Sequence, residues 1–207
     1  MRGRFITLEG GEGAGKSTQV KRLAEALRAR GLTVVETREP GGSPGAEAIR
    51  TLLLGGEEDR WTIEAEALLF AAARSDHLTR TILPALARGD WVLCDRFIDS
   101  SIAYQGLAGG LGGASIRKLH KFGSQDVYPD RTLLLELPGE AGAARAKARD
   151  TGGADRIGAR DADYHEAVAA AFTGLAKVEK HRIRRIDASG TPEQVTPRLL
   201  AAIEDLL

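Results

Sequence analysis

The sequence predicts an α/β protein with a three-layer α/β/α fold, in which helices cover both faces of a five-stranded parallel sheet. Strand and helix patterns alternate along the 207 residues, as a parallel sheet with crossover helices requires. The strands at 91–95 and 132–137 are apolar runs, typical of strands that are buried on both faces. The first strand, from Phe5, leads through a glycine-rich turn directly into a helix. We expect a single domain over residues 1–207.

The glycine-rich turn matches the phosphate-binding pattern G-x-x-x-x-G-K-[ST], in the strand–loop–helix context that the pattern requires. Glycines let the backbone approach a ligand, and the N–H groups at the helix N-terminus attract an anion. Lys16 is expected to reach the β- and γ-phosphates of ATP, and Ser17 to bind Mg²⁺. The predicted ATP-binding residues are Gly10, Gly11, Glu12, Gly13, Ala14, Gly15, Lys16, Ser17 and Thr18. The loop therefore indicates a P-loop NTPase fold.

Apolar residues at a spacing of 3.6 predict the helices, and Pro and Gly mark their ends. In chain order the predicted helices cover residues 16–30, 44–54, 62 onward, 114–122, 140–149, 163–180 and 192 onward. Gly31 ends the first helix, Pro44 suits the first turn of the second, and Pro84 breaks or restarts the third. The last helix is opened by a capping box at 191–194.

Short apolar runs between these helices predict the strands. They begin at residue 5 and continue at 32–35, 91–95, 132–137 and 183–186. Pro, Gly and charged residues predict loops at 37–44, 107–113 and 150–161. Ligands of parallel sheets bind beyond the carboxyl ends of the strands. We therefore expect the phosphate loop, Arg38, Asp95, Arg96 and Asp187 to share one edge of the sheet.

The bulk composition limits the possible partners. Lys+Arg and Asp+Glu number 29 each, and this zero net charge argues against general binding to nucleic acid or to an anionic membrane. The chain has no signal-peptide pattern and no apolar stretch of about 18 residues, so a membrane span is not expected. Cys94 is the one cysteine and cannot form an internal disulfide, which fits a cytoplasmic location.

Charged side chains at the strand ends indicate phosphoryl-transfer chemistry. Asp95, at the end of a buried strand, could help to hold Mg²⁺, and Arg96 could bridge the donor and acceptor phosphates. A strand-end ion pair is the alternative. A kinase also needs an acceptor-side anion site, for which Arg38, Arg50 and Arg74 are candidates, although each could equally be a solvated or packing arginine.

Two further features extend this interpretation. Phe70 and Arg74 lie four residues apart on one helical face, and a ring with a guanidinium suits a planar base, although such aromatics usually belong to the core. The segment at about 145–162 is either a solvated loop or a lid that excludes water and brings arginines to the transferring phosphoryl group. Its cations are Arg145, Lys147, Arg149, Arg156 and Arg160.

Six motifs occur in order along nearly the whole chain. They are residues 8–18, Thr37-Arg38-Glu39-Pro40-Gly41-Gly42, Leu69-Phe70-Ala71-Ala72-Ala73-Arg74, Asp95-Arg96-Phe97, residues 100–106 (Ser-Ser-Ile-Ala-Tyr-Gln-Gly) and Asp155-Arg156-Ile157. With these motifs the sequence resembles the bacterial thymidylate kinase (dTMP kinase) family. The resemblance implies ATP-dependent phosphorylation of dTMP to dTDP, with Mg²⁺ as cofactor and a homodimer formed through helices on one side of the sheet.

The resemblance also implies roles on the nucleoside side of the acceptor. Phe70 would stack on thymine, Arg74 would reach a base carbonyl and Ser101 would contact the base edge. Tyr104 and Gln105 would pack near the sugar and favour deoxyribose.

On the phosphate side, the resemblance implies that Arg50 and Arg96 hold the dTMP phosphate and that Glu12 approaches the 3′-hydroxyl or the metal. The phosphate loop has no arginine at its variable positions, so the lid would supply the catalytic one. Arg156 is the first choice, with Arg149 and Arg145 next. The predicted catalytic residues are Lys16, Arg96, Arg156 and Arg149.

Three other functions stay open from the sequence. The chain could be another nucleoside monophosphate kinase or a deoxynucleoside kinase, and dUMP is hard to separate from dTMP because one methyl group contributes only about 1–3 kcal/mol of discrimination. A nucleotide-dependent switch is disfavoured because the sequence has no Asn-Lys-x-Asp guanine motif. An inactive relative is disfavoured because Lys16, Ser17, Asp95, Arg96 and Arg156 are all present.

Overall fold

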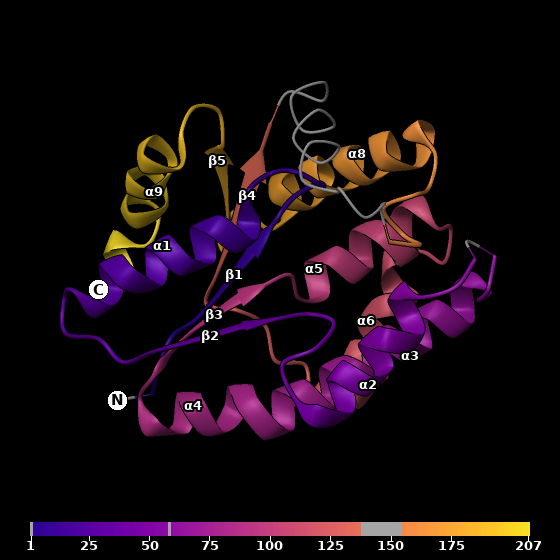
Figure 1. Cartoon of the computed structure of the whole chain (residues 1–207), viewed down its shortest axis with the longest axis horizontal. Helices are drawn as coiled ribbons and strands as arrows, with labels where there is room; N and C mark the ends of the chain where they lie inside the picture. Colours follow the sequence, from indigo (N-terminus) through magenta and orange to yellow (C-terminus); the bar gives the residue numbers. More distant parts are fainter. Residues whose placement is uncertain (1, 58, 138–154) are drawn as a thin grey trace.

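Five parallel strands form the predicted sheet, in the order β2-β3-β1-β4-β5 (Figure 1). The computed structural model describes residues 2–57, 59–137 and 155–207. The strands are β1 (Phe5–Glu9), β2 (Val34–Arg38), β3 (Trp91–Asp95), β4 (Arg131–Glu136) and β5 (Ile183–Asp187). Because β1 is central, the loop that follows it begins at the middle of the carboxyl edge, between the loops after β3 and β4.

Helices connect the strands and pack on both faces of the sheet. The α-helices are α1 (Lys16–Arg28), α2 (Pro44–Leu54), α3 (Ile63–His77), α4 (Leu83–Arg88), α5 (Ile98–Ser101), α6 (Gly113–Ser124), α8 (Ala162–Val178) and α9 (Pro192–Ala201). The π-helical segments η1 (Leu78–Ile82) and η2 (Ile102–Ala108) and the 3₁₀ turn η3 (Glu204–Leu206) complete the described elements. None of the described helices combines the length and apolar character that crossing a membrane requires.

Two apolar clusters make the structure three-layered. Side chains alternate between the faces of each strand, so Trp91 and Leu93 pack with α1 and α9, whereas Val92 and Cys94 pack with α4 and α8. Figure 1 shows α1 and α9 together on one side of the sheet and the other large helices on the opposite side. The central strand β1 is therefore buried throughout, and β3 and β4 are buried except at their last residues, as their apolar runs predict.

Two segments differ from the sequence prediction, at β2 and at residues 98–108. Strand β2 lies at Val34–Arg38 rather than 32–35, because Thr37 and Arg38 pair with β3 despite their loop-like neighbours. At Pro84, the predicted alternative of a restarted helix holds: Pro84 occupies the first turn of α4, directly after the wider turns of η1. Residues 98–108 are helical, although no helix was predicted there and the predicted loop at 107–113 overlaps the end of η2.

Most other elements agree with the prediction. Helix α2 has the predicted bounds, and the capping box at Thr191 and Gln194 opens α9. Helices α1 and α8 each end two residues before the predicted end. The predicted helix at 140–149 lies outside the described residues.

Glu9 is a buried acid at the end of β1. Its side chain is completely inaccessible and accepts hydrogen bonds from the backbone N–H of Phe97 at 2.7 Å and the hydroxyl of Ser100 at 2.6 Å. Burial and then the nearby Asp99 carboxylate raise the pKa of Glu9 to about 8. This carboxyl group therefore binds its proton more tightly in the folded protein than in the unfolded chain.

We predict that Glu9→Gln removes part of the pH dependence of folding stability. The protonated acid contributes stability that is complete below the unfolded pKa near 4.5 and is lost as the pH rises toward 8. The wild-type free energy of unfolding should therefore fall, by on the order of a few kcal/mol, between pH 5 and 8 relative to Glu9→Gln. Urea denaturation across this range measures it, with the exposed Glu25→Gln as control. Parallel curves for wild type and Glu9→Gln would contradict the prediction.

Candidate active site

The phosphate loop is preformed between β1 and α1. Gly10 has φ 136°, and a Cβ there would lie 2.4 Å from the carbonyl oxygen of Leu135, so this position requires glycine. Gly15 has φ 88° and precedes α1, whose N-terminus has no side-chain cap. The first N–H groups of α1 are thus available to an anion, as predicted. Gly11, in contrast, does not have a positive φ.

Lys16 folds back over this loop. Its ammonium group donates to the carbonyl oxygens of Gly10 at 3.0 Å and Gly11 at 2.7 Å. Burial, and then the charge of Arg96, lower the pKa of Lys16 to about 8. A bound polyphosphate would have the opposite effect, since a nearby anion favours the charged ammonium. The geometry therefore suits the predicted ATP contact.

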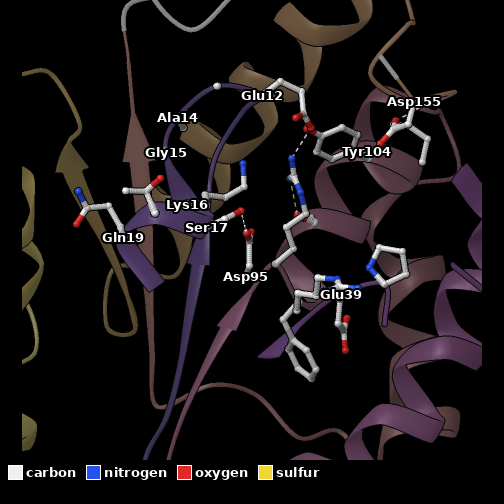
Figure 2. Close-up of a pocket in the computed structure, with 18 of the residues that line it drawn as sticks. Glu12, Ala14, Gly15, Lys16, Ser17, Gln19, Glu39, Asp95, Tyr104 and Asp155 are labelled. Carbon is white, nitrogen blue, oxygen red and sulfur yellow. Dashed lines mark hydrogen bonds and ion pairs between the residues drawn. The ribbon is translucent and has the colours of Figure 1, made fainter. Parts of the chain in front are cut away.

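Ser17 and Asp95 meet at the carboxyl edge, as the sequence predicts. The Ser17 hydroxyl donates to Oδ2 of Asp95 at 2.5 Å, which joins the start of α1 to the end of β3 (Figure 2). Hydroxyl and carboxylate oxygens are the ligands that Mg²⁺ prefers. Among the described residues, no group of three or more His, Cys, Asp and Glu side chains could hold a metal ion. A cation here would therefore have to share its coordination with a ligand and water.

Arg96 follows β3 in a left-handed backbone conformation, with φ 69°. Such a conformation in a residue other than glycine costs roughly 1–3 kcal/mol and often occurs at functional sites. The guanidinium donates to Glu12 at 2.5 Å, to Ser100 at 3.1 Å and to the carbonyl oxygen of Gly10 at 3.2 Å. Burial would lower the pKa of Arg96, but Tyr104 and then Glu12 raise it overall, so this side chain stays charged. The cation lies directly beside the phosphate loop.

Arg38 and Arg50 form a second cationic group. Arg38 donates to both carboxylate oxygens of Glu47, at 3.1 and 3.0 Å, and Arg50 donates to the carbonyl oxygen of Pro40 at 2.7 Å. Burial and then the charge of Arg38 lower the pKa of Arg50. Two like charges that disfavour one another form a site that an anion would stabilise.

Arg74 is buried and extensively bonded. Its Nε donates to Glu39 at 2.8 Å, and its Nη2 donates to the Ser101 hydroxyl at 2.7 Å. The Glu39 carboxylate also contacts His77, 3.1 Å away. Burial would raise the pKa of Glu39, but Arg74 and His77 lower it overall. Within the described part of the chain, Nη1 of Arg74 donates to no residue, so one nitrogen is available to a ligand.

One cavity of about 650 Å³ connects these groups (Figure 2). Sixteen of the predicted site residues line it: Glu12, Gly13, Ala14, Gly15, Lys16, Ser17, Thr18, Arg38, Arg50, Phe70, Arg74, Asp95, Arg96, Ser101, Tyr104 and Gln105. Ala188 and Gly190, in the turn after β5, also line it. Gly10 and Gly11 do not line the cavity; their carbonyl oxygens accept hydrogen bonds from the Lys16 ammonium group.

The predicted lid arginines are placed differently. Arg149, Arg145 and Lys147 lie outside the described residues. The side chain of Arg156 is fully buried and pairs with Glu66, so its guanidinium does not face the cavity in this structure. Its neighbours Asp155 and Ile157 line the cavity instead. The sequence predicted that Arg156 reaches the transferring phosphoryl group. The geometry corrects this prediction, because the buried acid Glu66 holds the Arg156 guanidinium away from the cavity.

Sequence reasoning missed four acids of this site. Glu9, Glu39, Glu66 and Asp155 orient other side chains or line the cavity. One signal was present, because Glu66 lies four residues before Phe70 and eight before Arg74, on the same face of α3.

Comparisons with known proteins agree with this geometry. A family model described as thymidylate kinase matches residues 8–198. The curated thymidylate kinase of Rhizorhabdus wittichii is 61% identical over 207 residues, covering 100% of both chains. That of Gluconobacter oxydans is 52% identical over 214 residues, covering 100% of this chain and 96% of the relative.

A solved structure gives the same result. A crystal structure of thymidylate kinase from Ehrlichia chaffeensis matches with a TM-score of 0.77 and 33% identity, covering 100% of both chains. The family model spans both the phosphate loop and the cavity described above. The chain therefore belongs to the thymidylate kinase family.

Proposed function

We propose that this chain transfers the γ-phosphate of ATP to dTMP, giving dTDP and ADP. The observation that carries the proposal is one cavity lined by two groups of cations: Lys16 in the phosphate loop, and Arg38 with Arg50 from β2 and α2. Arg96 lies beside the loop and suits contact with both phosphates. A site with one anion-binding group would suit a nucleotide switch, whereas two such groups suit transfer between phosphates.

The remaining residues of the cavity suit a nucleoside monophosphate. Phe70 supplies a flat ring, and Arg74 has Nη1 for a base carbonyl, while Ser101 is held by Arg74 itself. Tyr104 and Gln105 line the adjoining wall, where a sugar would lie. The acceptor phosphate is already ionised, so positioning and charge neutralisation replace a general base. The proposed catalytic residues are therefore Lys16 and Arg96, with any lid arginine still to be identified.

Mg²⁺ is the proposed cofactor, held by Ser17, by Asp95 directly or through water, and by ATP oxygens. The 2.5 Å contact between these side chains supports a shared position for them. When bound, the ion would neutralise charge on the transferring phosphates. The side chains themselves orient the start of α1 against β3.

We predict a strong preference for dTMP among acceptors. An assay of ADP release with dTMP, dUMP, dCMP, dGMP and AMP should show the highest kcat/KM for dTMP, because the cavity presents a ring and a single guanidinium to the base. The thymine methyl group should separate dTMP from dUMP by about 10–200-fold. Equal or better turnover of another acceptor would refute the assignment of substrate.

We predict that Lys16→Ala lowers kcat by about 10²–10³-fold or more, because it removes a buried cation from the developing phosphoryl charge. Lys21→Ala, an exposed position in the same helix, should keep normal activity and is the matched control. Steady-state kinetics at saturating ATP and dTMP measures the effect. Near-normal turnover of Lys16→Ala would exclude the phosphate-loop mechanism.

A cytoplasmic homodimer is proposed as the working form. Phe122 in α6 is 93% exposed and Leu68 in α3 is 56% exposed, and the two helices pack together on one side of the sheet. Large apolar side chains exposed on neighbouring helices are typical of a protein interface.

The cytoplasmic location is supported by the free, buried thiol of Cys94.

We predict that Phe122→Glu converts the homodimer to a monomer, because a charge would be desolvated in the interface. Analytical ultracentrifugation should show a twofold lower mass than for wild type, with the exposed Glu25→Gln as control. A wild type that sediments as a monomer would contradict the homodimer.

A further inference from the structure

Glu66 is a fully buried acid in α3 that connects four parts of the chain. Its Oε1 accepts a hydrogen bond from Nε2 of Gln105 at 2.9 Å. Its Oε2 accepts from Arg160 at 2.8 Å and from Arg156. The carboxylate thus has a neutral partner in η2 on one side and two cations from the segment before α8 on the other.

Arg156 and Arg160 each connect Glu66 to a further element of the structure. Nε of Arg156 donates to the carbonyl oxygen of Leu53 at 3.0 Å, at the C-terminus of α2. That end of a helix favours a positive charge. Nη1 of Arg160 donates to the Tyr164 hydroxyl at 2.6 Å, and this hydroxyl donates to the carbonyl oxygen of Tyr104 at 3.0 Å. The cluster therefore joins α2, α3, η2 and residues 155–160.

These four elements supply the proposed acceptor side of the cavity. Arg50 comes from α2, Phe70 from α3, Gln105 from η2, and Asp155 and Ile157 from the last segment. Figure 2 shows Asp155 and Tyr104 at one side of the cavity, away from Lys16 and Ser17. The phosphate loop and the turn after β5, which form the other side, make no described contact with Glu66.

Glu66 also fixes the orientation of the Gln105 side-chain amide. A carboxylate accepts hydrogen bonds only, so the amide nitrogen must face Glu66, and the amide oxygen is then the group available to a ligand. Replacing the acid by an amide would let Gln105 turn its oxygen toward position 66 instead. The acid thus determines which polar atom this wall presents.

Stability alone is a poor explanation for the cluster. Burying an ion pair costs desolvation free energy, and apolar residues of similar volume are often as stable or more so. A buried charge with three hydrogen-bonded neighbours instead defines one arrangement of the elements around it.

We propose that Glu66 and Arg156 are positioning residues that set the spacing and polarity of the acceptor side. This inference rests on the proposed function and deepens it. Neither residue faces the cavity, so both act through the residues that line it. The consequence is selective: loss of the pair impairs dTMP binding and leaves ATP binding intact.

Steady-state kinetics and calorimetric titration with dTMP test this inference on the full chain. Glu66→Gln is expected to raise the dTMP KM and Kd about tenfold, while the ATP KM changes less than about twofold. Glu64→Gln makes the same change of charge at an exposed position two residues away, and should match wild type. Parallel changes in both KM values, or no change in either, would overturn the inference.

Two further variants separate positioning from folding. Glu66→Gln with Arg156→Gln removes both charges of the pair, so it should melt closer to wild type than Glu66→Gln alone while the dTMP KM stays high. A dTMP KM that recovers together with the melting temperature would reduce the cluster to a stabilising role. Arg156→Ala should likewise raise the dTMP KM, and a loss confined to kcat would return Arg156 to the transition-state role.

Failure of the positioning inference can be distinguished from failure of the proposed function. A wild type that phosphorylates a different monophosphate refutes dTMP as the acceptor. The same comparison of acceptor KM against ATP KM then applies to that monophosphate, because the cluster would still adjoin its site.

Discussion

The concentration of positive charge at one edge of the sheet is the constraint on which the site depends. Lys16 and Arg96 lie together beside the phosphate loop, and the pKa of Lys16 is lowered by burial and by this neighbour. Each cation is stabilised by an oxygen of the protein itself: loop carbonyls for Lys16 and Glu12 for Arg96. Arg50 is held in the same way by the carbonyl of Pro40. Bound phosphates would replace these oxygens, so the resting site is already organised for anions.

Local patterns predicted the sheet and the phosphate loop well. Alternating strand and helix signals imply a parallel sheet, and the parallel sheet brings the loop after β1 beside the ends of β3 and β4. Ser17 and Asp95 were therefore predicted to approach each other although 78 positions separate them. Most helix bounds needed little beyond periodicity and capping residues.

Long-range pairing of buried charges could not be predicted in the same way. Arg156 belongs to a charged, glycine-containing segment, so its composition indicated an exposed lid; its acid partner lies 90 positions earlier. A sequence shows that Glu66 is present in an apolar helix, but not which cation neutralises it. Residues 98–108 were missed for a related reason, because packing against α8 makes a glycine-containing segment helical. Tertiary contacts, not local propensity, decide such cases.

Gly11 differs from the other glycines of the loop because its position can accept a side chain. Its backbone avoids the left-handed region, and an added Cβ would meet no atom within 4 Å. Its carbonyl oxygen nevertheless accepts the ammonium of Lys16 at 2.7 Å. A cysteine introduced here could carry a small environment-sensitive dye without rebuilding the loop. Such a dye would lie next to the hydrogen bond that Lys16 must exchange when a polyphosphate arrives, giving an optical signal for nucleotide occupancy.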